Sequence, residues 1–389
     1  IMLFGLPVVW NPALFVPFIA VPLVNMVVSY AAMAAGLVPP VVVDVSWTTP
    51  PLVGGWVATG SPAGAVLQLA CIVLGTVLYL PFLRRYERLA DAHARVQYDA
   101  LLSSFQDDER AGRSVELVTA AGSLGAVARS LAEDVRAAVD AGAFELRYQP
   151  QFDADGRAVG AEALLRMEPP VYGWLSPPLV IELAREAGAG GELERAVFER
   201  ALADAQAAEA LAHAGELDAG FSVSVNATAT MLQDEAAVGF VIDAFRARGL
   251  DAGRVVVEAT EREALLWDAG AHDLLRRVAD AGMPLAIDDF SMGRTSFQYL
   301  ETSVFSVVKL DGTIAKGVME NERYAEIVSS IADLSEHLGF TVLAEYVETA
   351  EQRDVLKTLG CSYFQGYLYA PALPFDEMVE RARLTGTLR

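Results

Sequence analysis

The sequence predicts an α/β protein in which a barrel of parallel strands follows a pair of membrane-spanning helices. From about Gly142 to Arg389, short apolar runs alternate with amphipathic segments, as the strands and helices of such a barrel do. About 250 residues is the usual length of this architecture. From Ile1 to Leu83, in contrast, Asp44 is the sole residue of the Asp, Glu, Lys or Arg type. This first part therefore lacks the charged groups that normally cover a soluble surface.

Two apolar segments of the first part, about Ala13 to Gly36 and about Ala63 to Leu83, approach the roughly 20 residues that cross a bilayer. Pro17, Pro22 and Asn25 interrupt the first segment, which indicates a broken or re-entrant helix inside a larger membrane bundle. A secretory signal peptide is the alternative, but no basic start precedes the apolar run. Arginines follow the second segment, at Arg84, Arg85, Arg88 and Arg95. Positive charge beside a span favours the cytoplasmic side, so we expect the downstream residues to be cytoplasmic.

The segment between the two parts is polar and helical in pattern. We expect a transmembrane segment over residues 1–87, a helical linker over residues 88–141 and the barrel over residues 142–389. The linker pattern also fits a signal-transmitting coiled coil, but it holds too few heptads to support that interpretation. A plain spacer is the simpler prediction.

The composition narrows the class of partner. The chain has 389 residues, 53% of them hydrophobic, and a formal net charge of -22. Such acidity argues against a nucleic-acid polymer, because binding a chain of phosphates requires a basic surface. Cys71 lies in a predicted span and Cys361 in the distant barrel, so we expect no structural disulfide. No pair among the four histidines has a zinc spacing. A small anionic ligand held through metal ions is compatible with this composition.

Polar and acidic residues stand at the ends of five strand-like apolar runs. They are Glu162, Asn226, Glu258, Asp288, Asp289 and Glu345. Because the carboxyl ends of parallel barrel strands meet at one mouth, we expect these side chains to converge. Several carboxylates at one mouth need cations between them, or some must take up protons. Oxygen ligands of this kind suit Mg²⁺ or Mn²⁺ better than zinc, so the sequence predicts a metal-dependent active site.

The barrel segment resembles the EAL domain, a phosphodiesterase domain with a TIM-like (β/α)8 barrel that linearises cyclic di-GMP. Its signature tripeptide stands here as Glu162, Ala163 and Leu164. YQP precedes the tripeptide, and SVNAT, VEATERE, IDDF, VKLDGT, AEYVET and FQGYLYA follow in family order. A lone EAL tripeptide would be unspecific, but these ordered blocks cover most of the barrel segment. The resemblance implies hydrolysis of cyclic di-GMP to pGpG, and a homodimer.

The resemblance also implies a role for individual residues. The ligands of two metal ions match Glu162, Asn226, Glu258 and Asp288 for the first ion, and Asp288 with Asp289 for the second. Two-metal sites hold their ions roughly 3.5 to 4 Å apart, so adjacent aspartates suit such a pair. The catalytic positions match Lys309, which orients the attacking water, Glu345 beside it, and Glu261, which steadies the loop after the aspartate pair. The substrate-binding positions match Gln149, Arg166, Asp311 and Gln365.

Two positions depart from the commonest family pattern. The usual Gly-Thr-Gly-Tyr run after Asp289 and Phe290 becomes Ser291 to Arg294, which puts the turnover rate in doubt more than the chemistry. Tyr346 replaces the usual glycine after Glu345, where it would narrow the guanine side of the site.

The first part of the chain resembles the C-terminal end of the sugar-permease (IIC) subunit of lactose/cellobiose-class phosphotransferase systems. FGLPVVWNP, VPLVN, GLVPP and WTTPP carry this resemblance, which covers about Ile1 to Glu87. It implies a multi-pass protein of the bacterial inner membrane, with the lipid bilayer as a partner and the EAL domain in the cytoplasm. The segment begins partway through that family's fold, so we expect a fragment or a permease reduced to an anchor or sensor. The sequence does not say which sugar would be sensed.

Three other functions compete with hydrolysis of cyclic di-GMP. A degenerate receptor would bind the dinucleotide without cleaving it, but such domains usually lose a metal ligand or the lysine, and this chain retains them. Sugar transport would need the upstream permease helices. A glycosidase that uses paired carboxylates would not require Asn226 and Lys309 at strand ends. No cyclase signature of the GGDEF type stands beside the barrel, so synthesis of the dinucleotide is not predicted.

Overall fold

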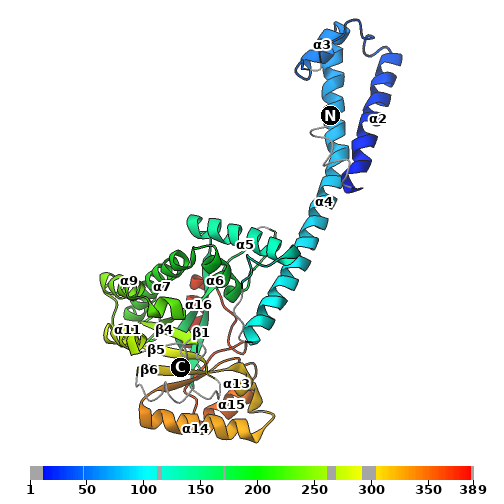
Figure 1. Cartoon of the computed structure of the whole chain (residues 1–389). Coiled ribbons are helices and arrows are strands. Elements are labelled where there is room, and N and C mark those ends of the chain that lie inside the picture. Colours follow the sequence, from blue (N-terminus) through cyan, green and yellow to red (C-terminus); the bar gives the residue numbers. More distant parts are fainter. Residues whose placement is uncertain are drawn as a thin grey trace. The chain divides into compact units, whose positions relative to one another are not determined.

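The chain forms two compact units, Ile1–Ala100 and Leu101–Arg389, which meet within the long helix α4 (Pro62–Arg110; Figure 1). The computed structural model describes residues 12–46, 48–111, 116–169, 171–260, 269–290 and 304–386. The domain boundaries predicted at residues 87 and 141 stay predictions.

The first unit contains two helices that are long and apolar enough to cross a membrane, by length and composition alone. They are α2 (Pro12–Ala34) and the first part of α4, and the short helix α3 (Val53–Thr59) precedes α4. Helix α2 runs without interruption through Pro17 and Pro22, so the break predicted there is wrong. A proline removes one backbone hydrogen bond and bends a helix, but it need not end it.

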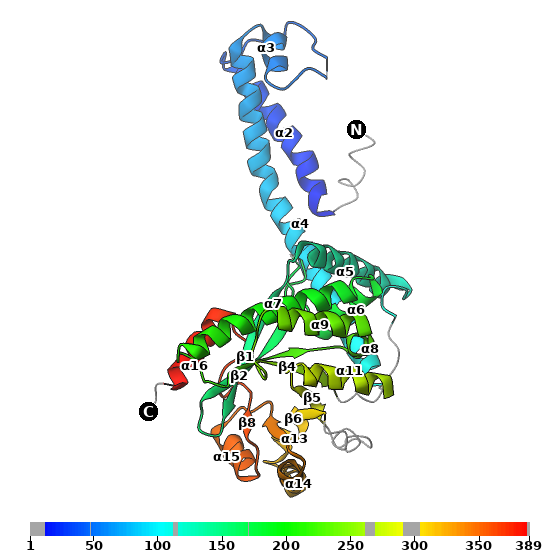
Figure 2. The ribbon, with the colours of Figure 1, turned by 90° about the vertical axis from the view of Figure 1, so that its left-hand side faces the viewer.

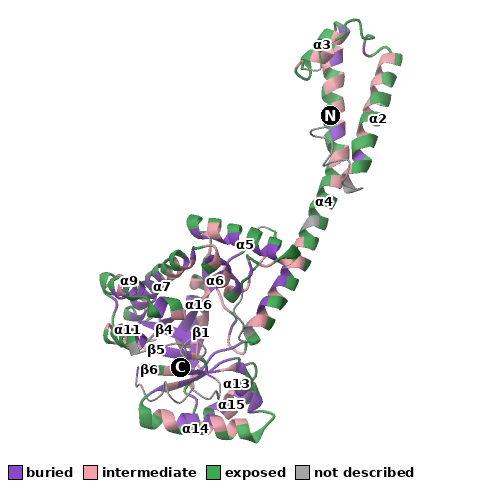
Figure 3. Ribbon diagram, in the orientation of Figure 1, coloured by how far each residue is buried: buried purple, intermediate pink, exposed green. Residues whose placement is uncertain are grey.

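Small residues allow close packing within the first unit. A Cβ atom at Gly75 of α4 would lie 3.1 Å from Val21 Cγ1 of α2, and Ser29 Oγ lies 3.7 Å from Cys71 Sγ. Most large apolar side chains of these helices are nevertheless exposed (Figure 3). Apolar helices that pack through small residues and expose the rest of their surface are typical of a lipid environment.

The second unit is built on a closed barrel of eight strands in sequence order, which confirms the predicted barrel. The strands are β1 (Glu145–Asp153), β2 (Ala158–Arg166), β3 (Ser222–Asn226), β4 (Val255–Thr260), β5 (Leu285–Phe290), β6 (Phe305–Leu310), β7 (Thr341–Ala344) and β8 (Tyr363–Phe364). Helices cover the barrel on the outside (Figure 2). They are α5 (Gly122–Ala141), α6 (Pro177–Glu186), α7 (Gly190–His213), α8 (Ala229–Gln233), α9 (Glu235–Ala247), α11 (Ala269–Asp280), α13 (Gly312–Gly317), α14 (Glu322–Leu338), α15 (Ala350–Thr358) and α16 (Phe375–Gly386).

Strand β1 corrects the prediction of an all-parallel barrel, because it runs antiparallel to both β2 and β8. A tight turn joins β1 to β2, and Gly156 in that turn has a φ of 79°. The backbone N–H of Asp153 donates to the carbonyl of Arg157 at 2.9 Å across the turn. So short a connection permits only antiparallel pairing, because parallel strands need a long crossover. The Asp-Gly pair in DADGR is the hairpin signal that indicated this turn.

Residues along each strand alternate between the outer core and the barrel interior. On β3, Val223 and Val225 join the apolar core, while Ser224 lines the barrel interior. The inward residues near the carboxyl ends of the strands are mostly polar, and those near the other end are mostly small or aliphatic. A cavity of about 160 Å³ lies among the latter and reaches Glu258. The barrel interior is therefore polar at the carboxyl ends of the strands, which we call the mouth, and contains the cavity toward the opposite end.

Candidate functional site

Lys309 of β6 lies at the centre of the polar mouth. It is fully buried, and its Nζ lies 2.6 Å from Glu258 Oε2, 3.0 Å from Asp288 Oδ1, 3.0 Å from Glu345 Oε1 and 3.2 Å from Glu162 Oε2. Each carboxylate stands on or directly after a different strand, namely β2, β4, β5 and β7. The fold thus brings together residues up to 183 positions apart in the sequence (345 − 162 = 183), as the strand-end pattern predicted.

Two amide side chains, in addition to Lys309, donate hydrogen bonds to the Glu162 carboxylate. Asn226 Nδ2 donates to Glu162 Oε1 at 2.8 Å, and Gln365 Nε2 donates to Glu162 Oε2 at 2.7 Å. Gln151 Nε2 donates in turn to Gln365 Oε1 at 3.0 Å. This relay joins both ends of the closed sheet, since Gln151 lies on β1 and Gln365 directly follows β8. Sequence reasoning missed Gln151, and its place two residues after Gln149 on one strand face was the available signal.

Four further predicted site residues are described. Gln149 of β1 contacts Gln365 Nε2 through its Oε1 at 3.3 Å, and Arg166 ends β2 with Nη1 donating to the Leu165 carbonyl at 2.9 Å. Asp311 caps α13, because its Oδ1 accepts from the Thr313 N–H at 2.6 Å. Asp289 follows Asp288 in a left-handed conformation with a φ of 53°. Glu261 and the Ser291 to Arg294 loop lie outside the described residues.

Burial raises the pKa of three carboxyl groups at the mouth, namely Glu258, Glu345 and Asp289. Desolvation raises the pKa of Glu258 to about 8, an effect that Lys309 opposes and the neighbouring carboxylates reinforce. Desolvation also raises the pKa of Glu345 well above its ordinary value. At Asp289, partial desolvation and the adjacent Asp288 charge raise the pKa to about 6. In the absence of further positive charge, these groups therefore take up protons at a higher pH than ordinary carboxyl groups do.

Glu162 and Lys309 behave in the opposite way. Burial acts to raise the pKa of Glu162, but Lys309 and the Gln365 and Asn226 donors hold it below its ordinary value. Burial alone would lower the pKa of Lys309, yet the surrounding carboxylates raise it well above the usual range. One ammonium group thus faces several carboxylates, and the negative charge at the mouth is in excess.

The donor set fits divalent cations. Glu162, Glu258 and Asp288 form one group, and Asp288, Asp289 and Glu345 form a second, with ligand oxygens within 4.8 Å of one another in each. The groups share Asp288, as expected of a residue that bridges two ions. All these ligands are hard oxygens, which suit Mg²⁺ or Mn²⁺. The excess negative charge provides the electrostatic reason for binding them.

Without metal ions, the barrel should lose stability as the pH rises from about 5 to about 8. The native pKa values of Glu258 and Asp289, about 8 and about 6, exceed their ordinary values of 4.5 and 3.8. Between those limits the native state binds more protons than the unfolded state, so the free energy of unfolding falls as the pH rises. The pKa of Glu162 is lowered, so its contribution to the free energy of unfolding is lost only as the pH falls below 4.5, outside this window.

Thermal unfolding midpoints measured from pH 5 to pH 8, in EDTA and in Mg²⁺, test this pH dependence. Magnesium should remove most of the decline, because the ions replace the protons. A midpoint that rises with pH in EDTA would contradict the conclusion that the mouth carries an excess of negative charge.

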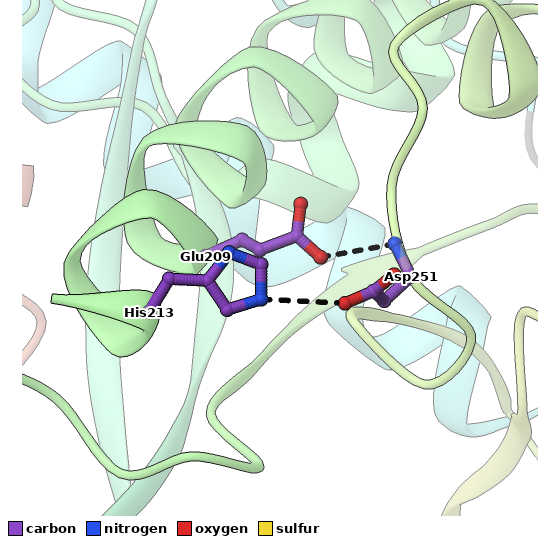
Figure 4. Close-up of side chains that lie close together, drawn as sticks. All are labelled: Glu209, His213 and Asp251. Carbon is purple, nitrogen blue, oxygen red and sulfur yellow. Dashed lines mark hydrogen bonds and ion pairs between the residues drawn. The ribbon is translucent and has the colours of Figure 1, made fainter. Parts of the chain in front are cut away.

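A second acidic cluster, formed by α7 and the segment before β4, is held together by contacts within the protein. Glu209 and His213 of α7 lie beside Asp251 (Figure 4). Glu209 Oε1 accepts from the Asp251 N–H at 2.9 Å and from Arg254 Nε at 3.2 Å, so its carboxylate is already paired. His213 Nε2 lies 3.4 Å from Asp251 Oδ2, and both side chains are largely exposed. His213 is therefore an exposed residue at the end of α7.

Replacing Glu209 with alanine should lower the free energy of unfolding by about 2 kcal/mol, because it leaves the buried Arg254 without its carboxylate. His213→Ala should change it by less than about 0.5 kcal/mol, since that side chain is exposed. Urea-induced unfolding measures the free energy of unfolding of both variants. Both variants should bind Mn²⁺ as the unmodified chain does. Loss of Mn²⁺ binding in either would show that this cluster holds a metal.

The closed barrel with its carboxylate cluster defines the class: a barrel protein with an oxygen-rich acidic site at the carboxyl ends of its strands. A family model described as EAL domain matches residues 132–372, which is more than half of the chain. The chain therefore belongs to the EAL domain family.

Known proteins share this barrel. Over 251 residues the chain is 35% identical to an uncharacterized protein of Mycobacterium tuberculosis (strain H37Rv), a match that covers 63% of this chain and 80% of that protein. The structure of the PaMucR phosphodiesterase in complex with c-di-GMP is similar with a TM-score of 0.59 and 28% identity, covering 64% of this chain and 99% of that one. EAL enzyme Bd1971, in a form with cAMP and cyclic di-GMP bound, gives a TM-score of 0.61 and 26% identity, covering 66% and 69%.

Proposed function

We propose that the chain is a metal-dependent phosphodiesterase that hydrolyses cyclic di-GMP to linear pGpG. The observation that carries this proposal is the convergence of the predicted metal-binding carboxylates on the buried amine of Lys309. The similarity to a phosphodiesterase and to an EAL enzyme whose structures contain cyclic di-GMP supports the choice of substrate.

Each of the described site residues would have a separate role in the reaction. Two Mg²⁺ or Mn²⁺ ions would polarise the phosphate and lower the pKa of a bound water. The ligands proposed for these ions are Glu162, Asn226, Glu258, Asp288 and Asp289. Lys309 would orient the attacking water, and Glu345, 3.0 Å from its Nζ, would fix the ammonium group in place. Attack on phosphorus breaks the bond to the 3′ oxygen, which takes a proton from the water and leaves as a hydroxyl.

The remaining predicted contacts belong to substrate binding. Arg166 at the end of β2 would hold a phosphate through its guanidinium group, whose paired N–H groups suit that geometry. Gln149 and Gln365 form the inner wall of the mouth, and Glu261 would steady the loop after Asp289.

We also propose that α2 and the first part of α4 anchor the chain in the bacterial inner membrane, with the barrel in the cytoplasm. Their length and apolar composition support this placement. The resemblance of residues 1–87 to a sugar permease stays a prediction, because the family match covers residues 132–372. Homodimerisation likewise stays a prediction.

A direct assay tests the proposed reaction. The full chain, purified in a mild detergent, is incubated with cyclic di-GMP and Mg²⁺, Mn²⁺ or EDTA, and chromatography follows pGpG. Product that requires the metal supports the phosphodiesterase. The second candidate is a receptor, which the altered residues Ser291 to Arg294 favour; cyclic di-GMP bound in equilibrium dialysis without product would establish it.

A further inference from the structure

Tyr346 is held in an unusual backbone conformation directly after Glu345. Its φ is 53°, in the left-handed region that glycine adopts freely and a bulky residue adopts only at a cost in free energy. Hydrogen bonds fix the segment around it. The Val347 N–H donates to the Gln365 carbonyl at 3.0 Å, and Gln352 Nε2 donates to the Tyr346 carbonyl at 3.2 Å. The segment therefore keeps a tyrosine where a glycine would be less strained.

The Tyr346 ring lies against the start of α13. A Cβ atom built on Gly312 would lie 2.5 Å from Tyr346 Cδ2, so the ring occupies the space that a side chain at position 312 would need. Lys316 Nζ lies 5.6 Å from the ring centroid, and Glu348 Oε1 holds that amine at 2.7 Å. Gly312 and Lys316 are four residues apart on one helix, so they lie on the same helix face. Both therefore approach the ring from α13.

The rest of the tyrosine faces solvent at the mouth of the barrel. Tyr346 is 54% exposed, whereas its neighbours Glu345 and Val347 are buried. Tyr346 directly follows Glu345 at the end of β7, and its ring lies against Gly312, two residues after β6 ends at Leu310. It is thus an aromatic side chain that is held from α13, exposed over about half of its surface and next to the carboxylate cluster.

We propose that Tyr346 is a specificity-determining residue whose open ring face stacks on a purine base of the substrate. This inference rests on the proposed function, in which the substrate carries two guanine bases. Aromatic side chains stack on nucleobases, and loss of the ring should weaken binding roughly tenfold, which is about 1.4 kcal/mol. A seated ring also loses less side-chain freedom on binding than a mobile one.

Three variants of the full chain in detergent test the proposal through KM, kcat and the thermal unfolding midpoint. Tyr346→Gly removes the ring and suits the left-handed backbone, so it should raise KM for cyclic di-GMP roughly tenfold, leave kcat within about twofold and preserve the midpoint. Tyr346→Phe keeps the ring and should match the unmodified chain. Gly312→Ala should push the ring aside and raise KM, but it should have no effect on KM when added to Tyr346→Gly.

The outcomes separate this inference from the proposed function. If the unmodified chain produces pGpG and Tyr346→Gly leaves KM unchanged, the stacking role is wrong and the phosphodiesterase stands. A Gly312→Ala effect that persists in the Tyr346→Gly background would likewise overturn the stacking role. If the unmodified chain binds cyclic di-GMP without cleaving it, dissociation constants from equilibrium dialysis replace KM in the same comparison. If it neither binds nor cleaves the dinucleotide, both proposals fail.

Discussion

Lys309→Met is expected to abolish hydrolysis of cyclic di-GMP and to destabilise the metal-free barrel. The Lys309 amine is fully buried among four carboxylates, so its loss leaves several negative charges without compensation. Breaking a buried charge pair in this way costs roughly 3–5 kcal/mol. Loss of a group that orients a reacting proton or water costs roughly a hundredfold to ten-thousandfold in rate.

The destabilisation should depend on pH and on metal ions. At about pH 5 the carboxyl groups with raised pKa values can take up protons, so the loss of stability should be smaller there than at pH 8. Mg²⁺ should also reduce it, because the ions supply positive charge to the same carboxylates. Thermal unfolding with and without Mg²⁺ measures this.

Lys357→Met is the matched control for Lys309→Met. Lys357 is exposed on α15, and its Nζ donates to the Ala154 carbonyl at 2.7 Å. The same change there should alter stability by less than about 0.5 kcal/mol and leave hydrolysis intact. Equal effects of the two variants would remove the basis for placing Lys309 at the reacting centre.

Glu162→Gln is expected to remove metal-dependent hydrolysis while the barrel stays folded. Glu162 accepts hydrogen bonds from Asn226, Gln365 and Lys309, and a glutamine there would turn one acceptor oxygen into a donor that faces these donors. The variant also loses a proposed ligand of the first ion. Losing only an outer partner of a metal ligand costs roughly 10- to 100-fold in affinity or activity, so losing the ligand should cost more.

Titration calorimetry with Mn²⁺ and the pGpG assay measure the effect of Glu162→Gln. Glu235→Gln provides the control, because Glu235 is an exposed residue in the first turn of α9 that pairs with Arg277 and is not among the proposed ligands. Full Mn²⁺ affinity in Glu162→Gln would mean that the first ion, if bound, uses a different ligand set.

The convergence of the carboxylates could be predicted from the sequence because it depends on local patterns. Each acidic residue ends an apolar run, and strand ends meet at one mouth whatever the sequence separation. The amide relay from Gln151 through Gln365 to Glu162 could not be predicted in this way. It joins the first and last strands, which become neighbours only when the sheet closes.

Two other features show where sequence patterns were incomplete. The regular alternation of strands and helices predicted parallel strands throughout, and the Asp-Gly pair before Arg157, which is typical of a hairpin, was not used. The contact between Tyr346 and Gly312 depends on a close approach of ring to backbone, and no periodicity in the sequence records such an approach. The hydrogen bond by which Asp311 caps α13 is likewise a local contact that the periodicity of the sequence does not record.

The reversed direction of β1 determines where the chain enters the barrel. Glu145 at the start of β1 pairs with Arg166 at the end of β2, so the segment that follows α5 arrives at the rim where β2 ends. In an all-parallel barrel it would arrive at the opposite end. Helix α5 is also tied to the loop after α6, since Arg136 Nη1 donates to the Gly188 carbonyl at 3.2 Å. Residues 142–144 alone separate α5 from β1, so a displacement of α5 would be transmitted to the rim that holds Arg166 before it reached the opposite end of the barrel.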